Sequence, residues 1–306
     1  MKSLLLADNI RGKRVIVRVD WNVPIKDGQV VDDSRIHASL STLNLLQKEG
    51  AKTVVISHLE SGETDSLLPV FNSVKEICNI SFCDAKDLAS KRKCIDSLKE
   101  GEILLLENLR LDPREKENKE DFAEELATFG EIFVNEAFSA SHRKHASIVG
   151  IPKFLPSYAG IQFEEEVAHL KSALKPKHPF LLILGGAKFE TKLPLLEKFI
   201  NIADDIFVGG ALAHNFFQEQ GRDIKKSLVS KGDFNIFELL RSGKIMLPTD
   251  LVWDKERIID AGYESIEALG KKIKEAKLIL WNGPVGLYEE GFKDGTEALA
   301  KLISES

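Results

Sequence analysis

The 306-residue sequence has few cysteines and no long apolar run. Its three cysteines, Cys78, Cys83 and Cys94, follow no metal-binding spacing, and an odd number is typical of reduced thiols in a cytosolic protein. No segment reaches the roughly 18 apolar residues of a membrane span, and the apolar stretch near the start is too short for a signal peptide. A net charge of −6 argues against a nucleic-acid or acidic-membrane partner. We therefore expect a soluble protein of the cytoplasm.

Two phosphate-binding fingerprints are also missing. The Walker pattern Gly-x-x-x-x-Gly-Lys-Ser/Thr does not occur, and no Gly-x-Gly-x-x-Gly follows a strand-like segment. A nicotinamide-dependent dehydrogenase would suit the architecture described next, but it would need the second of these fingerprints. Short-period repeats and low-complexity segments are absent as well.

The sequence does contain a regular alternation of strand-like and helix-like segments. The strand-like runs lie at residues 14–20, 52–58, 102–108, 131–138, 180–186, 204–210, 244–248 and 277–283. Between them, apolar residues recur at helical spacing, as at Ile36, Leu40 and Leu43. Such alternation predicts parallel sheets with helices on both faces. We expect an α/β fold of two doubly wound, Rossmann-like domains.

A boundary between the two domains is predicted at residues 158–178. Turn residues come first, a charged amphipathic helix follows over 163–174, and the proline-containing stretch "KPKHP" cannot continue that helix. We predict an N-terminal domain over residues 1–157, a joining helix and linker over 158–178, and a C-terminal domain over 179–306.

Basic residues of the first half stand where predicted strands end. This set consists of His58, Arg110, His142, Arg143 and His145. Arg35 opens a helix, where the macrodipole disfavours a cation. Strand carboxyl ends share one rim of a parallel sheet, and guanidinium groups bind oxyanions through two hydrogen bonds. We predict a site for a small phosphorylated or carboxylate ligand, with Asp20 and Asn22 near its hydroxyls; solvated arginines and turn-forming Asp and Asn are the alternative.

The second half offers a different anion site. Lys188 and Lys192 lie four residues apart where a helix begins after a Gly-Gly turn, and like charges there are unfavourable. An anion between them would reverse that effect, as phosphates do at helix N-termini. Gly209 and Gly210 follow another strand, where a flat base could approach the backbone. Two solvent-extended lysines and an ordinary tight turn are the alternative interpretations.

Seven segments together resemble those of one family, phosphoglycerate kinase. They occur in the family's order as RVDWNVP, DDSRI, SHL, LLENLR, VNEAFSASHRKHASIVGIP, LGGAKFETK and LWNGPVGLYE. The resemblance implies a first domain that binds the phosphoglycerate and a second that binds ATP or ADP. It implies the glycolytic phosphoryl transfer between 1,3-bisphosphoglycerate and ADP, giving 3-phosphoglycerate and ATP. A monomer is the implied state, and Mg²⁺ would be carried by the nucleotide.

The resemblance also assigns roles to residues at the matching positions. For the phosphoglycerate it implies contacts from Asp20, Asn22, Arg35, His58, Arg110, His142 and Arg143. For the nucleotide it implies contacts from Lys188, Lys192, Gly209, Gly210, Asn282, Pro284 and Glu289. The implied catalytic residues are Arg35, Lys188 and Lys192, because phosphoryl transfer depends on positioning and charge neutralisation. Glu289 would accept hydrogen bonds from the ribose hydroxyls.

The sequence departs from the family pattern at several places. Glu60, Ser61 and Gly62 stand where the family has Gly-Arg-Pro, so an arginine for the substrate's remote phosphate is missing and Glu60 would repel that phosphate. Ala211 replaces a usual third glycine. The segment between 247–254 and 260–269 is shorter than in the family.

The last departure is the end of the sequence at Ser306, before the family's Gly-Gly-Gly-Asp turn. From it we expect an incomplete second domain with one unpaired sheet edge, weak ATP binding, little or no transfer, and a tendency to associate. The alternative to the enzyme is a non-catalytic relative that binds a phosphorylated metabolite or nucleotide as a sensor or interaction protein.

Overall fold

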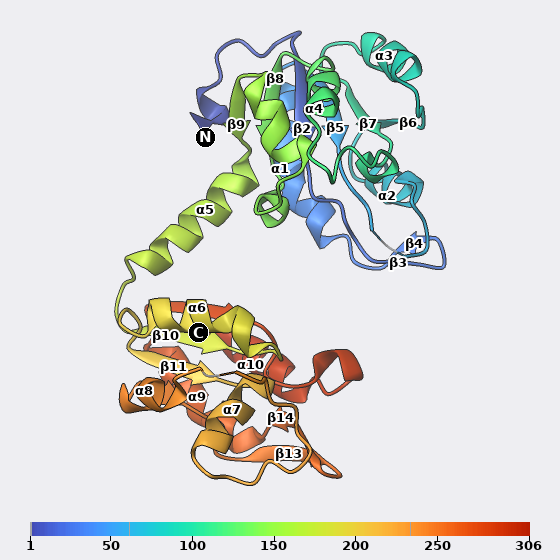
Figure 1. Ribbon diagram of the computed structural model, residues 1–306. Coiled ribbons are helices and arrows are strands. Elements are labelled where there is room, and N and C mark those ends of the chain that lie inside the picture. Colours follow the sequence, from blue (N-terminus) through green and yellow to red (C-terminus); the bar gives the residue numbers. More distant parts are fainter. Residues whose placement is uncertain (1, 61, 233) are drawn as a thin grey trace. The chain divides into compact units, whose positions relative to one another are not determined.

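The computed structural model describes residues 2–60, 62–232 and 234–306, and the chain divides into two compact units, Met1–His169 and Leu170–Ser306 (Figure 1). Helix α5 (Ile161–Leu174) contains the boundary between the units and lies inside the segment predicted to join two domains. The prediction that the family's arginine is missing at Ser61 concerns a residue outside the described ranges.

The first unit is built on a seven-stranded sheet in which every paired strand is parallel to its neighbour. In spatial order the strands are β1 (Lys2–Ser3), β9 (Ser157–Ala159), β8 (Ile132–Asn135), β2 (Arg14–Arg18), β5 (Lys52–Ile56), β7 (Ile103–Leu106) and β6 (Ser81–Cys83). A separate two-stranded antiparallel pair, β3 (Ile25–Lys26) and β4 (Gln29–Val30), follows β2 along the chain.

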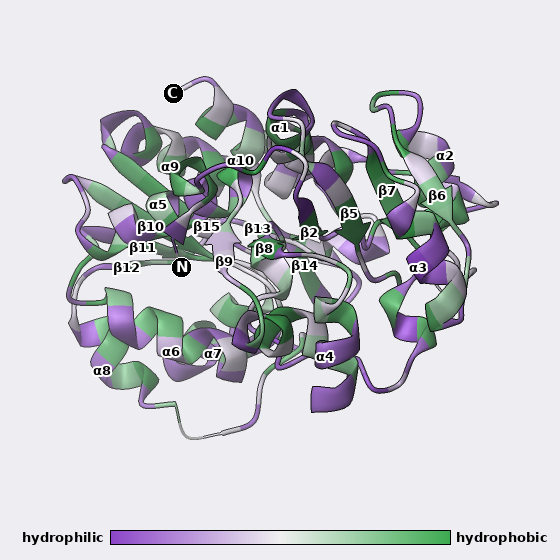
Figure 2. Ribbon diagram, turned by 90° about the horizontal axis from the view of Figure 1, so that it is seen from above, coloured by the Kyte–Doolittle hydropathy of each residue, from purple (hydrophilic) through white to green (hydrophobic). Residues whose placement is uncertain are grey.

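Helices cover both faces of this sheet. Helices α1 (Ser34–Lys48) and α2 (Leu68–Val74) pack on one face, and α3 (Leu88–Asp96) and α4 (Glu120–Ala127) pack on the other. Because side chains alternate along a strand, Val15 and Val17 of β2 enter the first core and Ile16 enters the second. Figure 2 shows β5 and β7 mainly in the hydrophobic colour, as expected for strands buried on both sides. The predicted doubly wound α/β architecture is confirmed for this unit.

The remaining elements of the first unit are short helical turns. They are η1 (Leu4–Leu6), η2 (Leu109–Leu111), η3 (Phe138–Ala140), the π-helix η4 (Ala146–Gly150) and η5 (Ile151–Lys153). Two of them, η2 and η3, directly follow the strands β7 and β8.

The expectation of three reduced cysteines is wrong. Cys83 at the end of β6 and Cys94 in α3 form a disulfide, while Cys78 is free and buried. The pair was missed because its two members are brought together only when α3 folds back beside β6, which the sequence separation of 11 does not reveal.

The second unit contains a four-stranded parallel sheet with helices on both faces. In spatial order the strands are β12 (Ile245–Met246), β11 (Asp205–Val208), β10 (Phe180–Leu184) and β15 (Leu278–Asn282). Helices α6 (Phe189–Phe199), α7 (Ala211–Glu219) and α8 (Ile236–Arg241) cover one face, and α9 (Tyr263–Glu275) and α10 (Asp294–Ser304) cover the other. An antiparallel pair, β13 (Leu251–Asp254) and β14 (Arg257–Ala261), and the turn η6 (Tyr288–Glu290) complete the unit.

In the part of the chain that the structure describes, no helix is both long enough and apolar enough to cross a membrane.

Candidate functional site

The carboxyl edge of the first sheet brings together several residues predicted from the sequence. Asp20 and Asn22 follow β2, His58 follows β5, and Arg110 lies in η2 after β7. Arg143 comes shortly after β8 and η3. Because these strands are parallel neighbours, their carboxyl ends meet at the same edge.

Arg35, in the first turn of α1, is held by a carboxylate at this edge. Its Nη1 donates to Asp20 Oδ2 at 2.8 Å, and the Ser139 hydroxyl donates to the same oxygen. The Arg35 side chain is 50% exposed, whereas that of Asp20 is only 10% exposed. Asp20 therefore fixes one face of the Arg35 guanidinium and leaves the rest of it accessible.

Arg18, the last residue of β2, is a functional candidate that the sequence reasoning did not single out. It is fully buried; its Nε donates to Ser147 Oγ at 2.9 Å and its Nη2 donates to His58 Nδ1 at 3.0 Å. Ser147 in turn donates from its hydroxyl and its backbone N–H to the buried carboxylate of Glu115. Burial lowers the pKa of Arg18 to about 10, and the charge of Glu115 partly opposes that shift. The only signal in the sequence was an arginine at the end of an apolar strand.

His58 is neutral in this environment. Burial, followed by the charges of Arg18 and Arg110, lowers the pKa of His58 to about 2. Because a guanidinium can only donate, His58 Nδ1 accepts from Arg18 and the ring hydrogen sits on Nε2.

Three buried polar atoms at this edge lack a partner within the described ranges: His58 Nε2, Arg110 Nε and His145 Nδ1. Burial and then the charges of Arg110 and Arg143 lower the pKa of His145 to about 4. Buried polar groups are nearly always hydrogen-bonded, so three unpartnered polar atoms around the same arginines are unusual and leave hydrogen-bonding capacity for a polar ligand.

We call the group of cations that surrounds these atoms the basic cluster. It consists of Arg18, Arg110, Lys116 and Arg143, with His58 and His145 beside them. Three of its cations, Arg110, Lys116 and Arg143, contact Glu60, whose backbone N–H also donates to Asn22 Oδ1 at 2.8 Å. His142, by contrast, is exposed and forms no hydrogen bond or ion pair with the described residues.

In the second unit, glycine turns interlock at the carboxyl ends of β10, β11 and β15. Gly186 N donates to Pro284 O at 2.8 Å, and Gly210 N donates to Val285 O at 2.9 Å. A Cβ on Gly210, whose φ is +60°, would lie 2.9 Å from the backbone nitrogen of Gly186. Gly209 is equally confined, since a Cβ there would meet Val285 at 3.0 Å. These two glycines are therefore packed against neighbouring parts of the chain, and the approach of a flat base to their backbone stays a prediction.

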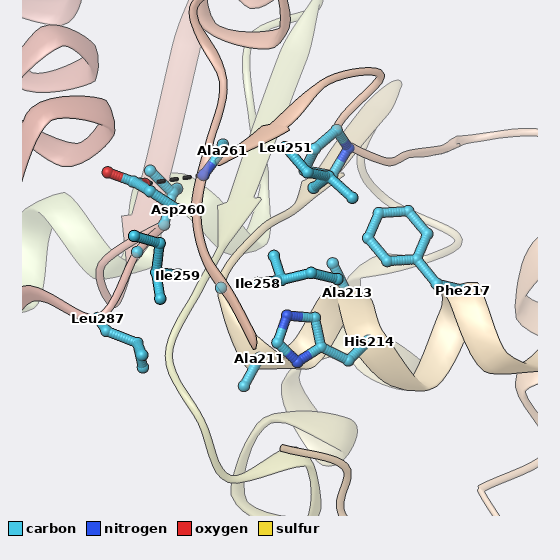
Figure 3. Close-up of a pocket in the computed structure, with 14 residues that line it drawn as sticks. Ala211, Ala213, His214, Phe217, Leu251, Ile258, Ile259, Asp260, Ala261 and Leu287 are labelled. Atoms are coloured by element: carbon cyan, nitrogen blue, oxygen red, sulfur yellow. Dashed lines mark hydrogen bonds between the residues drawn. The ribbon is translucent and has the colours of Figure 1, made fainter. Parts of the chain in front are cut away.

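An apolar pocket lies beside these turns (Figure 3). It is lined by Gly210, Ala211, Ala213, His214, Phe217, Pro248, Leu251, Ile258, Ile259, Asp260, Ala261, Val285, Gly286 and Leu287. His214 and Phe217 project from α7 toward Leu251 and Ile258 of the β13–β14 pair. The free volume is about 10 Å³, which is room for roughly one water molecule. A purine base could enter only if these lining side chains move apart.

The other predicted nucleotide residues stand around the turns. Lys188 is the exposed N-cap residue of α6, and Lys192, one turn later, donates from Nζ to Asn282 Oδ1. Glu289 is exposed in η6 and does not line the pocket. Among the described residues, no group of three or more His, Cys, Asp or Glu side chains is arranged to hold a metal ion.

Comparison with known proteins gives the family. The family model for phosphoglycerate kinase matches residues 6–306. A phosphoglycerate kinase of Coprothermobacter proteolyticus is 39% identical over 330 residues, which cover 97% of this chain and 84% of that protein. A phosphoglycerate kinase of Herpetosiphon aurantiacus is 37% identical, and the match covers 96% of this chain and 84% of that protein.

Solved structures agree with this result. The phosphoglycerate kinase of Coxiella burnetii is 30% identical, with a TM-score of 0.81 over 99% of this chain and 85% of that one. The phosphoglycerate kinase of Pyrococcus horikoshii OT3 is 27% identical, with a TM-score of 0.85 over 100% of this chain and 86% of that one. A two-domain, Rossmann-like α/β fold of the kinase class is thus established. The chain belongs to the phosphoglycerate kinase family, and small-molecule substrates follow from that membership.

Proposed function

We propose that this chain is a phosphoglycerate kinase, which transfers a phosphoryl group between 1,3-bisphosphoglycerate and ADP to give 3-phosphoglycerate and ATP. The observation that carries the proposal is the basic cluster at the carboxyl edge of the first sheet, with its three unpartnered buried polar atoms. A ligand with several oxyanion groups fits such a site, because each charged hydrogen bond to a guanidinium is worth about 1.5–3 kcal/mol.

In the proposed reaction the bond between the phosphorus and the acyl oxygen of 1,3-bisphosphoglycerate breaks. A new bond forms between that phosphorus and a terminal oxygen of ADP, and the carboxylate of 3-phosphoglycerate leaves. Asp20, Asn22, His58, Arg110, His142 and Arg143 are the proposed phosphoglycerate contacts. Arg35 is proposed to neutralise charge on the moving phosphoryl group, and its support is the half-exposed guanidinium that Asp20 holds in place.

The nucleotide is proposed to bind at the glycine turns of the second unit. The backbone at Gly209 and Gly210 is proposed to face the base, Lys188 and Lys192 the phosphates, and Glu289 the ribose hydroxyls, with Asn282 and Pro284 shaping the turn. The confined glycines and the Lys192–Asn282 contact support this arrangement. Mg²⁺ is proposed to arrive with the nucleotide, where it would neutralise phosphate charge during transfer. A monomer in the cytoplasm remains our prediction for the state and location of the protein.

A coupled assay of the whole chain with 3-phosphoglycerate, ATP and Mg²⁺ tests the proposal. The expected result is turnover that disappears when EDTA removes the metal. A kcat in the ordinary enzyme range, about 1–10³ s⁻¹, would show that the expectation of little or no transfer is wrong. Binding of both ligands without turnover would identify a non-catalytic relative instead. Failure to bind 3-phosphoglycerate at all would remove the basic cluster from the substrate site.

A further inference from the structure

Glu60 places a carboxylate among the cations of the basic cluster. Its Oε1 lies 2.5 Å from Lys116 Nζ and 3.7 Å from Arg110 Nη1, and its Oε2 lies 3.7 Å from Arg143 Nη1. The hydrogen bond from Lys116 is the main cause that lowers the pKa of Glu60, so this side chain is ionised near neutral pH. Both carboxylate oxygens face cations, as the oxygens of an anionic ligand would.

The backbone fixes the starting point of this side chain. The Glu60 backbone N–H donates to Asn22 Oδ1 at 2.8 Å. The backbone N–H of the preceding residue Leu59 donates to Asn108 Oδ1, and Asn108 Nδ2 donates to the carbonyl of Leu59, each at 3.0 Å. Leu59 itself is 1% exposed. A surface glutamate often pairs with nearby cations at little energetic gain. Here, however, the three cations come from different turns of the chain, and the position of Glu60 relative to them is set by buried neighbours.

Glu60 does not provide a hydrogen-bonding partner for every buried polar atom of the basic cluster. Its carboxylate faces Arg110 through Nη1, whereas Arg110 Nε, His58 Nε2 and His145 Nδ1 have no partner among residues 2–60, 62–232 and 234–306. The Glu60 carboxylate supplies one negative charge to Arg110, Lys116 and Arg143, and Arg110 also feels the charge of the buried Glu115. An external anion that binds these cations must therefore share them with Glu60.

We propose that Glu60 is an internal competitor for the substrate anion: its carboxylate occupies part of the anion site, and a ligand phosphate or carboxylate gains the cations of the basic cluster only by displacing it. The inference rests on the proposed function for the identity of the ligand, 3-phosphoglycerate, but not for the competition itself. Glu60 is then a specificity-determining residue, because its repulsion grows with ligand charge and penalises a dianionic group more than a monoanionic one.

Titration of the whole chain with two tetrahedral anions, sulfate and perchlorate, followed by NMR, tests the competition. Removal of the charge by Glu60→Gln is expected to tighten sulfate binding about tenfold or more, and perchlorate binding by less. Glu60→Asp keeps the charge and is expected to stay close to the parent. Glu117→Gln is the matched control, since Glu117 is exposed on the same loop as Lys116 but pairs with Lys119; it is expected to change sulfate binding by less than about twofold.

Two results would overturn the inference. Unchanged sulfate affinity in Glu60→Gln would show that the carboxylate does not compete, and weaker affinity would show that it positions the arginines for the ligand. The kinase assay separates this inference from the proposed function. Tighter sulfate binding without turnover in either form refutes the kinase and leaves the competition standing; an active parent whose sulfate affinity and KM for 3-phosphoglycerate are untouched by Glu60→Gln refutes only the competition.

Discussion

Arg35 is the side chain whose environment best matches a role in charge neutralisation. Asp20 holds its guanidinium at 2.8 Å while half of the side chain stays accessible. Arg35→Ala is therefore expected to lower kcat by on the order of 10²-fold or more, with a smaller change in 3-phosphoglycerate affinity. Arg92→Ala, at an exposed position of α3, is the control and should leave both values unchanged. Full kcat in Arg35→Ala would exclude Arg35 from the mechanism.

His58 makes stability depend on pH in a defined direction. Its pKa in the folded chain is about 2, while the unfolded chain takes up a proton at its ordinary pKa of about 6.5. The unfolded state thus binds more protons between these values, and stability falls as the pH decreases from about 6.5. His145, with a folded pKa of about 4, acts in the same direction.

Urea denaturation at about pH 7.5 and pH 5 measures this effect. The parent should lose more stability on acidification than a His58→Gln variant, which has no group to protonate at that position. Equal losses in the two proteins would contradict the neutral, buried state of His58.

Residue types at strand ends allowed only part of the proposed substrate site to be predicted. His58, Arg110 and Arg143 could be found because cations after apolar runs are unusual. The role of Arg18 could not be predicted, because its hydrogen-bonding partner Ser147 lies 129 positions further along the chain. Glu115, which accepts from Ser147, lies 32 positions from Ser147. Glu60 was expected only to repel a phosphate; that three cations of the chain converge on it depends on tertiary structure.

At the scale of elements, the interlocked glycine turns of the second unit limit substitution. Gly210→Ala should destabilise the chain by about 1–3 kcal/mol for its unusual backbone conformation, and further for the collision with Gly186. Gly221→Ala is the matched control: Gly221 also has positive φ, +72°, but a Cβ there would meet nothing within 4 Å. Urea unfolding should show a clearly larger loss for Gly210→Ala, and equal losses would mean that the turns can separate.

The disulfide ties β6 to α3 and should contribute to the stability of the first unit. A loop of this size, with a sequence separation of 11, corresponds to about 2–3 kcal/mol in the chain-entropy account. Dithiothreitol is expected to lower the thermal midpoint of the parent by several degrees and to leave a Cys83→Ala, Cys94→Ala variant unaffected. Alkylation of the unreduced, unfolded chain should label Cys78 alone; labelling of all three cysteines would contradict the disulfide.

Elements with long apolar runs were the predictable ones. Strands β2, β5, β7, β8, β10 and β11 are buried on both faces, so their sequences are nearly continuous apolar runs. The strands β1 and β9 and the π-helix η4 gave no such signal, because they are short and depend on neighbours for their shape. The hairpin β13–β14 was noticed only as a shortened segment.

At the scale of the whole molecule, the first unit has what an independent domain needs. It contains its own seven-stranded sheet, a core on each face of that sheet, and the entire basic cluster. The fragment Met1–His169 is expected to unfold in one cooperative transition and to bind sulfate with the affinity of the full chain. Gradual unfolding by circular dichroism, or lost sulfate binding in a folded fragment, would show that the unit depends on the rest of the chain.

The pairing of β1 with β9 has a consequence for the order of events during synthesis. Strand β1 finds its hydrogen-bonding partner only when residues 157–159 have also been synthesised. At about 5–20 residues per second, β1 waits roughly eight to thirty seconds for β9, while the other strands of the sheet are synthesised in between. Strand β1 is therefore, after β9, the last strand of this sheet to be put in place, and its docking completes the sheet after nearly all of the first unit has been translated.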